Sequence, residues 1–478
     1  MTDISWLAIA PETLLAVGAA AVLLVDVQWK PPVRVLGAIT GMTLLLAAAA
    51  AVVQWPVAAS PALSFSGMIV LDPTAVFGRF AVLSVTALGI VAGWELFERL
   101  GRRAAEGLAL VLLAATGFAF MASSVHLVMI FMGLEIGSIS LYVLAGITRE
   151  NRTSDEAAMK YFLLGSAASA VFVYGVALVY AGTGGLNLLA IQSFLGGVVL
   201  TRPAVLLIGI ALLVVGLGFK ITAAPFHSWA PDVYQGAPAG VVGFMAAAAK
   251  LGGFAALTRI LFSAFPLYRE DWAPVVAGIA ALSVVVGTVL AIVQTDVRRL
   301  LAYSGVAHAG FILTGIVAGG TGGPAVWFYL AVYTIQLVGA FGVVAAVGGS
   351  TRSGSDLDDY AGLAKRSPFL AAAFALLLLG MAGLPLTAGF IAKFGVFRDA
   401  WEGGFEWLVV VALLASVAAL YAYLRVVVVM YMRDPETTAP VPARGTTRWA
   451  VSIAVAVTIV LGLMPRPLLD LAGDALPL

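Results

Sequence analysis

Ionisable side chains inside apolar runs are the residues of this sequence best placed to do chemistry. Four of them lie within separate apolar runs: Glu135, Lys220 and Lys250 near the middle of theirs, and Lys393 after a helix break in its own. A charge at the centre of a bilayer costs about 2.5–3.5 kcal/mol on insertion scales, so such residues usually pair with one another or serve transport. Because carboxyl groups and amines gain and lose protons as their surroundings change, the chemistry that we expect is proton transfer.

Glu135 has no charged partner within one turn of its own helix, which leaves two interpretations. It is either a neutral carboxyl group that is hydrogen-bonded to Ser138 or to a neighbouring helix, or a titrating carboxylate paired with a lysine of another span. Lys220 and Lys250 lie too far from a helix end to reach the headgroups easily. A facing carboxylate would stabilise the charged form of such a lysine, so a Glu135–Lys220 pair would change protonation when one partner moved.

Five further ionisable residues within or beside apolar runs allow more than one role. Lys160 lies about one turn inside its run, where it can serve proton transfer or reach the headgroups. His308 is either a central proton carrier or a hydrogen-bonded core histidine. Arg79 is expected to pair with Asp72, seven residues earlier on about the same helix face. Arg425 is expected to reach a phosphate or a subunit interface.

The composition requires a lipid environment for these residues. Of 478 residues, 62% are hydrophobic and 11% charged, and the mean hydropathy is +1.05. Soluble chains carry about 25% charged residues, so the composition excludes a soluble enzyme, a nucleic-acid-binding protein and a disordered scaffold. There is no cysteine, and the three histidines share no metal-ligand spacing. We therefore expect no metal and no redox cofactor in this chain.

The apolar runs predict an all-α polytopic membrane protein with about fourteen transmembrane helices. The predicted spans are 5–26, 34–53, 69–94, 104–121, 123–148, 156–183, 203–230, 237–263, 273–294, 300–318, 323–349, 367–397, 404–432 and 447–468.

Basic residues in the predicted loops indicate the orientation. The loops after odd-numbered spans contain fifteen: Lys30, Arg34, Arg99, Arg102, Arg103, Arg149, Arg152, Arg298, Arg299, Arg352, Lys365, Arg366, Arg433, Arg444 and Arg448. The loops after even-numbered spans contain four: Arg202, Arg259, Arg269 and Arg398. By the positive-inside rule the odd loops are cytoplasmic, so both termini are expected on the outer side.

Two of the predicted spans contain a helix break beside their lysine. Pro225 removes a backbone donor and frees the carbonyl of Ile221, close to Lys220, whereas the break at Gly383–Pro385 precedes Lys393. A single break can be an ordinary kink, but two of them beside buried lysines indicate inverted repeats around an ion path. Because the breaks are five spans apart, spans 4–8 and 9–13 are expected to form two inverted five-helix repeats.

The breaks also suggest how the chain divides. Residues 1–103 are expected to form an N-terminal three-helix segment. Residues 104–263 and 264–432 are expected to be the two repeats, each forming a half-channel, and residues 433–478 a loop and a C-terminal helix.

One continuous motif and three short ones resemble a known family. Residues 219–238, FKITAAPFHSWAPDVYQGAP, resemble the signature of the antiporter-like proton-pumping subunits of respiratory NADH:quinone oxidoreductase, complex I. The short motifs are Glu135 in the fifth span, Lys250 in AAAAKL and Lys393 in AGFIAKF. The ending DVYQGAP, a lysine in the twelfth span and the early APETLL are similar to subunit N, the relative of mitochondrial subunit 2.

The resemblance implies a role for each candidate residue. Glu135 and Lys220 would form the paired switch of the first half-channel, and Lys160 would help to set the charge of that pair. Lys250 would pass the proton along a central polar axis to which His308 would contribute. Lys393 would serve the second half-channel.

The resemblance also implies a setting in the bacterial plasma membrane, among other membrane-arm subunits. NAD, FMN, iron–sulfur clusters and quinone would be bound by partner subunits, and the proton would be the transported ion. Three rivals stay open: a cation/proton antiporter subunit, the membrane arm of a hydrogenase or of a dehydrogenase with another electron donor, and a structural spacer.

Overall fold

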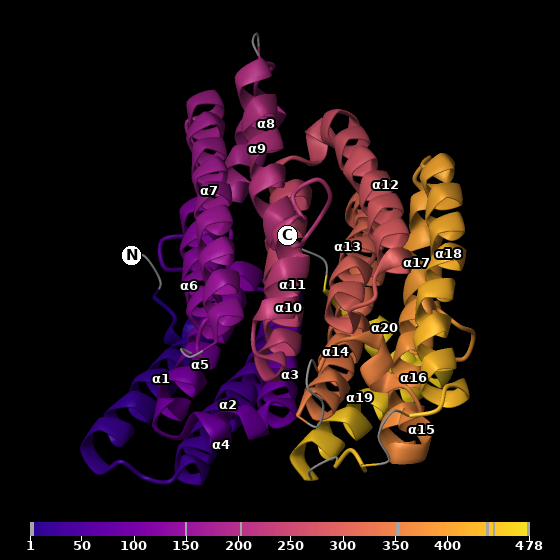
Figure 1. Cartoon of the computed structure of the whole chain (residues 1–478). Helices are drawn as coiled ribbons and strands as arrows, with labels where there is room; N and C mark the ends of the chain where they lie inside the picture. Colours follow the sequence, from indigo (N-terminus) through magenta and orange to yellow (C-terminus); the bar gives the residue numbers. More distant parts are fainter. Residues whose placement is uncertain are drawn as a thin grey trace.

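The fold is a bundle of long helices that lie side by side (Figure 1). It is known from a computed structural model that describes residues 4–148, 151–200, 203–349, 354–435, 439–442 and 445–475. Eleven helices in this part of the chain are long and apolar enough to cross a membrane. The other three predicted spans correspond to α13 and to two broken helices, α9–α10 and α16–α17. The prediction of about fourteen spans is confirmed.

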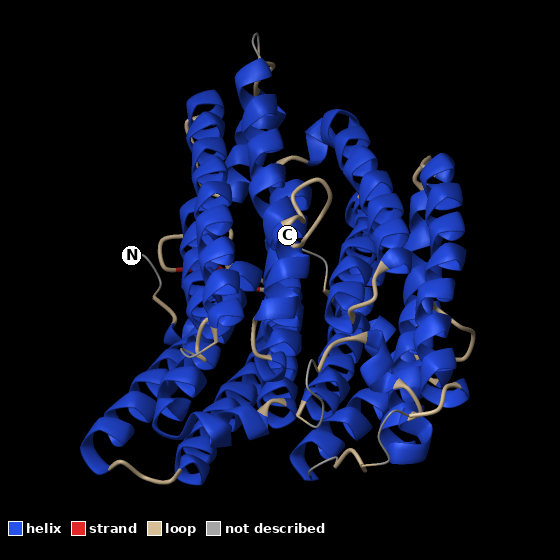
Figure 2. Ribbon diagram, in the orientation of Figure 1, coloured by secondary structure: helices blue, strands red, loops and turns tan. Residues whose placement is uncertain are grey.

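The first segment contains three long helices and a small hairpin. After the short helix η1 (Trp6–Ile9), the long helices are α1 (Ala10–Trp29), α2 (Val33–Ala58) and α3 (Pro73–Ala92). Strands β1 (Ala62–Ser64) and β2 (Ile69–Leu71) pair antiparallel between α2 and α3, with Leu63 opposite Val70. The short helices α4 (Trp94–Leu100) and η2 (Gly101–Arg103) lead into the first repeat. Figure 2 shows how small a part of the fold the strands form.

The two repeats follow one another along the chain. The first comprises α5 (Ala104–Ser123), α6 (Leu127–Ala145), α7 (Arg152–Thr183), α9 (Ala204–Lys220), α10 (Trp229–Gly236) and α11 (Ala239–Arg259), with the short α8 (Leu188–Gly197) before α9. The second comprises α12 (Arg269–Val293), α13 (Val297–Ile316), α14 (Gly323–Gly348), α16 (Pro368–Ala382), α17 (Ala388–Glu402) and α18 (Glu406–Met432), with the short α15 (Leu363–Arg366) before α16. The chain continues through α19 (Gly445–Leu463) and α20 (Arg466–Asp474).

Both expected helix breaks are present, one in each repeat. The first separates α9 from α10 and contains Pro225, and the second separates α16 from α17. Gly383 ends α16 with φ +88°, a conformation that glycine adopts without a steric penalty. Lys220 is the last residue before the first break, whereas Lys393 lies after the second. The two lysines therefore lie on opposite sides of their breaks along the chain.

Close packing places the broken helices around a buried centre. Helices α11 and α14 are buried along most of their length, whereas α2, α7 and α18 expose many apolar side chains. Glycines allow close helix contacts: a Cβ atom on Gly117 of α5 would lie 2.4 Å from the backbone nitrogen of Gly137 on α6. Such approaches are typical of helix packing in membranes.

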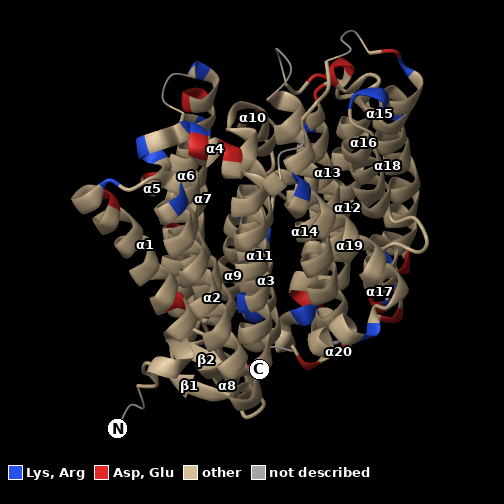
Figure 3. Cartoon of the chain, turned by 90° about the horizontal axis from the view of Figure 1, so that it is seen from below, with Lys and Arg blue, Asp and Glu red and all other residues tan. Residues whose placement is uncertain are grey.

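Charged residues gather at the end of the bundle where α4, α10 and α15 lie (Figure 3). The hairpin, α8 and α20 lie at the opposite end. Most of the basic residues that were counted in the odd-numbered loops lie beside α4, α10 or α15, so the structure groups them at one end. Arg149, Arg202, Arg352 and Arg444 lie outside the described residues.

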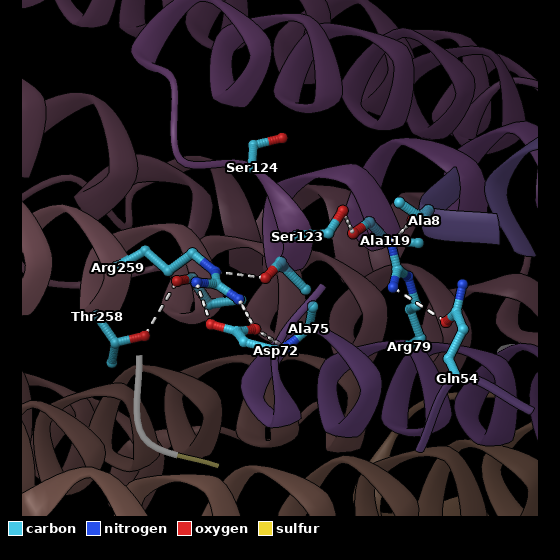
Figure 4. A network of polar contacts seen from close by, with 12 residues as sticks. Ala8, Gln54, Asp72, Ala75, Arg79, Ala119, Ser123, Ser124, Thr258 and Arg259 are labelled. Carbon is cyan, nitrogen blue, oxygen red and sulfur yellow. Dashed lines mark hydrogen bonds and ion pairs between the residues drawn. The ribbon is translucent and has the colours of Figure 1, made fainter. Parts of the chain in front are cut away.

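Two buried ion pairs involve the first segment, and they correct one prediction (Figure 4). Arg79 does not pair with Asp72: its Nε donates to Glu12 of α1 at 2.8 Å, and its Nη1 to Gln54 of α2 at 3.0 Å. Asp72 instead accepts two bonds from Arg259 of α11, at 2.6 and 2.9 Å. Asp72 caps the start of α3, where its carboxylate also accepts from the backbone nitrogen of Ala75.

The position of Arg259 is a second correction. The sequence predicts it at the outer end of a span and counts it with the loops, but its side chain is 0% exposed. Its Nε also donates to the carbonyl of Ala122 at 2.5 Å. Sequence spacing along one helix could not reveal either partner, because both lie on other helices.

Candidate functional site

Lys220 lies at the end of α9 and is buried, with 1% of its surface exposed. Its Nζ donates to Ser138 Oγ at 2.8 Å and to Tyr161 Oη at 3.4 Å. It also lies over the rings of Phe118, Tyr142 and Tyr161, at 5.4–5.7 Å from their centroids. Hydroxyl groups and aromatic faces therefore surround this ammonium group. No carboxylate forms an ion pair with it in the described part of the chain.

Glu135 lies one turn before Ser138 on α6, but it faces a different neighbour. Its carboxylate accepts a hydrogen bond from Ser169 of α7. It also lines an open groove of about 460 Å³ between α6 and α7, together with Phe131, Ser166 and Tyr174. The expected direct contact between Glu135 and Lys220 is thus not formed in this conformation. Ser138 lies between them along α6.

Lys250 of α11 occupies a site made by the first helix break. Its Nζ donates to the carbonyl of Ile221 at 2.8 Å, to the hydroxyl of Thr222, and to the carbonyl of Gly305 on α13 at 3.0 Å. The carbonyl of Ile221 is the one that Pro225 was expected to free, because proline has no N–H to donate four residues later. A cation at a helix C-terminus is also stabilised by the helix dipole.

Lys393 of α17 occupies the matching site at the second break. Its Nζ donates to the carbonyl of Ala382, the last residue of α16, at 2.8 Å and to Ser416 Oγ on α18 at 2.7 Å. It lies 4.5 Å from the centroid of the Phe311 ring. Each break therefore offers a free carbonyl that a buried lysine binds.

His308 of α13 lies among three tyrosines. Its Nδ1 is 2.8 Å from Tyr329 Oη and its Nε2 is 3.3 Å from Tyr423 Oη. Its ring stacks on Tyr333 with 4.2 Å between the centroids. The sequence alone left open whether this histidine carries protons or is a hydrogen-bonded core residue. Its hydrogen bonds are compatible with both.

Lys160 lies in a more exposed network at the charged end of the bundle. Its Nζ is 2.8 Å from both Glu156 and Asp232, and 42% of its side chain is exposed. Asp232 of α10 also binds Arg299 of α13 at 2.7 Å. Burial acts to raise the pKa of Asp232, but the hydrogen bonds and charges of Lys160 and Arg299 outweigh it and hold that pKa below its ordinary value. This network connects α7, α10 and α13.

Arg425, which the sequence suggested for a phosphate or subunit contact, lies near the end of α12. Its guanidinium group donates to the carbonyl of Gln294, at the end of α12. Among the described residues, no cluster of three or more His, Asp or Glu side chains is arranged to hold a metal ion.

The neutral partners of the lysines were not singled out from the sequence. They are the hydroxyl groups of Ser138, Tyr161, Thr222 and Ser416, together with the freed carbonyls. Polar residues within apolar runs are the only sequence signal for them, and such residues are common. What the arrangement offers chemically is a set of three buried amines, each held by uncharged acceptors.

Comparisons with known proteins place this arrangement in a family. Residues 124–419 match the family described as NADH:quinone oxidoreductase/Mrp antiporter, TM. NADH-quinone oxidoreductase subunit N of Rhodococcus opacus is 48% identical over 371 residues, which cover 77% of this chain and 68% of that protein. The subunit N of Chloroflexus aggregans is 39% identical over 98% of this chain and 96% of that protein.

The fold agrees with these matches. A chain of respiratory complex I from Thermus thermophilus is similar with a TM-score of 0.81 and 35% identity, over 96% of this chain and 98% of that one. The residues matched by the family model, 124–419, include both broken helices and the candidate residues Glu135, Lys160, Lys220, Lys250, His308 and Lys393. The chain belongs to the NADH-quinone oxidoreductase subunit N family, as its motifs predicted.

Proposed function

We propose that this protein is a proton-translocating membrane-arm subunit of an NADH:quinone oxidoreductase. The observation that most directly supports this proposal concerns Lys220, Lys250 and Lys393. Each is at most 5% exposed, and each donates hydrogen bonds to hydroxyl groups or carbonyls. A buried ammonium with only neutral partners is poorly compensated. Such an amine can therefore release its proton and regain it when its surroundings change.

The energies involved suit coupled transport. Moving one charge against 100 mV costs about 2.3 kcal/mol. One hydrogen bond to a charged group contributes about 1.5–3 kcal/mol. Gain or loss of a single contact at a buried lysine is therefore enough to drive one proton step. The short movements of a helix at its break can make or remove such a contact.

The roles follow the two repeats. Glu135 and Lys220 form the switch of the first half-channel, within residues 104–263, and Lys160 influences it from the charged end. Lys250 and His308 carry protons between the halves. Lys393 serves the second half-channel, within residues 264–432. Residues 1–103 and 433–478 flank these two units.

The setting that we propose is a complex in the bacterial plasma membrane. Electron transfer takes place in partner subunits, which hold the FMN and iron–sulfur clusters and bind NAD and quinone, and this chain has no redox centre of its own. The grouping of basic residues at one end supports a cytoplasmic position for that end and an outer position for both termini.

Proton pumping by the complete complex tests the proposal. Lys220→Ala and Glu135→Ala are expected to abolish NADH-driven proton pumping in inverted membrane vesicles, and Lys250→Ala and Lys393→Ala to lower it. Lys365→Ala is the control, because that side chain is 65% exposed at the surface. Assembly of each variant complex is checked by native electrophoresis. Pumping at the control rate in assembled complexes of all four variants would show that these residues form no proton path.

The main alternative is a cation/proton antiporter subunit, since the matched family includes Mrp antiporters. Purification with flavin and iron–sulfur subunits supports our proposal, whereas purification with small membrane subunits alone supports the antiporter. A hydrogenase-type or other-donor complex would oxidise its own donor rather than NADH. A structural spacer would tolerate all four substitutions.

A further inference from the structure

A chain of hydroxyl groups and one imidazole crosses the centre of the protein between the Lys250 and Lys393 sites. Tyr423 Oη is 2.5 Å from Ser304 Oγ and 3.3 Å from His308 Nε2, and His308 Nδ1 is 2.8 Å from Tyr329 Oη. The four residues come from α13, α14 and α18, and each is at most 2% exposed.

Two members of this hydrogen-bonded chain lie close in sequence to residues that contact the two lysines. Ser304 precedes Gly305, whose carbonyl accepts from Lys250 Nζ. Phe311, less than one turn after His308 on α13, contacts Lys393 through its ring. The hydrogen-bonded chain therefore occupies the space that a proton must cross between the two helix breaks.

Every member of the chain can both give and accept a proton. A hydroxyl group donates one hydrogen bond and accepts others, and a neutral imidazole donates at one nitrogen and accepts at the other. When a proton enters at one end, each member passes its own proton to the next and takes one from the previous member. One proton leaves at the far end, and no bond other than the O–H and N–H bonds changes.

A fourth hydroxyl group, that of Tyr333, is buried in this region without a hydrogen bond to the described residues. Burial of a tyrosine here therefore does not by itself require one. Tyr333 Oη is buried and has no hydrogen-bond partner among the described residues. A Cβ atom on Gly305 would lie 3.4 Å from this oxygen and 3.7 Å from Lys250 Nζ, so both groups face the same point. An unpaired buried hydroxyl group is commonly met by a water molecule, which would extend the chain towards Lys250.

We propose that Tyr423 is a proton-relay residue whose hydroxyl group carries protons between Ser304, beside Lys250, and His308. This inference rests on the proposed function and adds to it a residue on α18 that neither the sequence motifs nor the buried charges indicated. Tyr423 is the only described tyrosine that bonds both Ser304 and His308. Removing its hydroxyl group therefore interrupts the hydrogen-bonded chain between Ser304 and His308.

The test uses Tyr423→Phe in the complete complex, which removes one oxygen and keeps the ring. Tyr421→Phe is the matched control, since Tyr421 lies two residues away on the same helix and is 59% exposed. Positioned proton-transfer groups contribute about 10²–10⁴-fold to rates. Because water can partly replace a lost hydroxyl group, we expect the pumping rate to fall by about tenfold or more and the Tyr421→Phe rate to stay at the wild-type value.

A solvent isotope comparison separates relay from packing. If Tyr423 passes protons, its loss makes proton transfer slower than the other steps, so the ratio of pumping rates in H₂O and D₂O rises above that of the wild type. A packing defect lowers both rates alike, and an unchanged ratio overturns the proposal. If Tyr423→Phe does not assemble, Ser304→Ala removes the other end of the same hydrogen bond, and normal pumping in that variant also overturns it.

Lys250→Ala is measured alongside to separate this proposal from the proposed function. Normal pumping in Lys250→Ala contradicts the proton path as a whole. Defective pumping in Lys250→Ala with normal pumping in Tyr423→Phe rejects the relay alone.

Discussion

The Asp72–Arg259 pair allows the sharpest prediction about how this protein is held together. The substitution is Arg259→Leu, which removes the guanidinium group that binds both oxygens of Asp72 and the carbonyl of Ala122. Asp72 stays buried, with the backbone nitrogen of Ala75 as its remaining hydrogen-bond donor. The contact between the start of α3 and the end of α11 then contains an uncompensated negative charge.

The expected cost follows from the burial of both partners. Their side chains are 0% and 1% exposed, so water cannot replace the lost bonds. Removing one member of a buried ion pair costs about 3–5 kcal/mol. The double variant Asp72→Asn with Arg259→Leu removes both charges of this pair, and asparagine still caps α3. We therefore expect the double variant to recover most of the stability that Arg259→Leu loses.

The free energy of unfolding of the purified protein in mild detergent, measured by titration with SDS, checks both values. The control is Arg433→Leu, which breaks a surface ion pair with Asp358. The side chain of Arg433 is 59% exposed and that of Asp358 is 71% exposed. Exposed pairs contribute about 0–1 kcal/mol. An Arg259→Leu loss no larger than that of the control, or a double variant less stable than Arg259→Leu, would refute the reasoning from burial.

Two further predictions concern the second helix break and the charged end of the bundle. Gly389→Ala should prevent correct packing of α16 against α17, because its Cβ atom would lie 1.9 Å from the carbonyl oxygen of Gly380, whereas Gly278→Ala meets no atom within 4 Å and should be tolerated. The amounts of folded protein in the membrane compare the two, and equal amounts would contradict the prediction. Asp232→Asn should lower thermal stability at pH 7 by less than about 1 kcal/mol, because this ion pair is partly exposed. The pKa of Asp232 is lowered in the folded protein, so the stability difference between Asp232→Asn and wild type should shrink below pH 3.8 and vanish at lower pH. A stability difference that grows on acidification would contradict a stabilising ion pair at Asp232.

The membrane spans and their breaks could be predicted because they depend on local sequence. A run of about 20 apolar residues crosses the bilayer whatever its neighbours are, and Pro225 opens a helix wherever that helix lies. The same holds for the depth of Lys220, Lys250 and Lys393, which their positions within the runs determine. Motif resemblance then added the family, which the matches along nearly the whole chain confirm.

The partners of the buried charges depend on how the helices pack. Arg79 and Asp72 share a helix and suit each other by spacing, yet Arg79 binds α1 and α2 while Asp72 binds α11. Whether Glu135 meets Lys220 also depends on the rotation of α6, which directs Ser138 to Lys220 and Glu135 to Ser169. No pattern along one helix contains that rotation.

The sequence by itself therefore determined which residues are placed in the membrane and where the backbone must open. Only the tertiary structure decided that Lys250 and Lys393 bind the freed carbonyls, and that Tyr423 joins Ser304 to His308. The physical reason is that apolar burial is a property of each segment, whereas a hydrogen bond requires two groups within about 3 Å in a suitable direction. Contacts between distant helices meet that condition only once the bundle has packed.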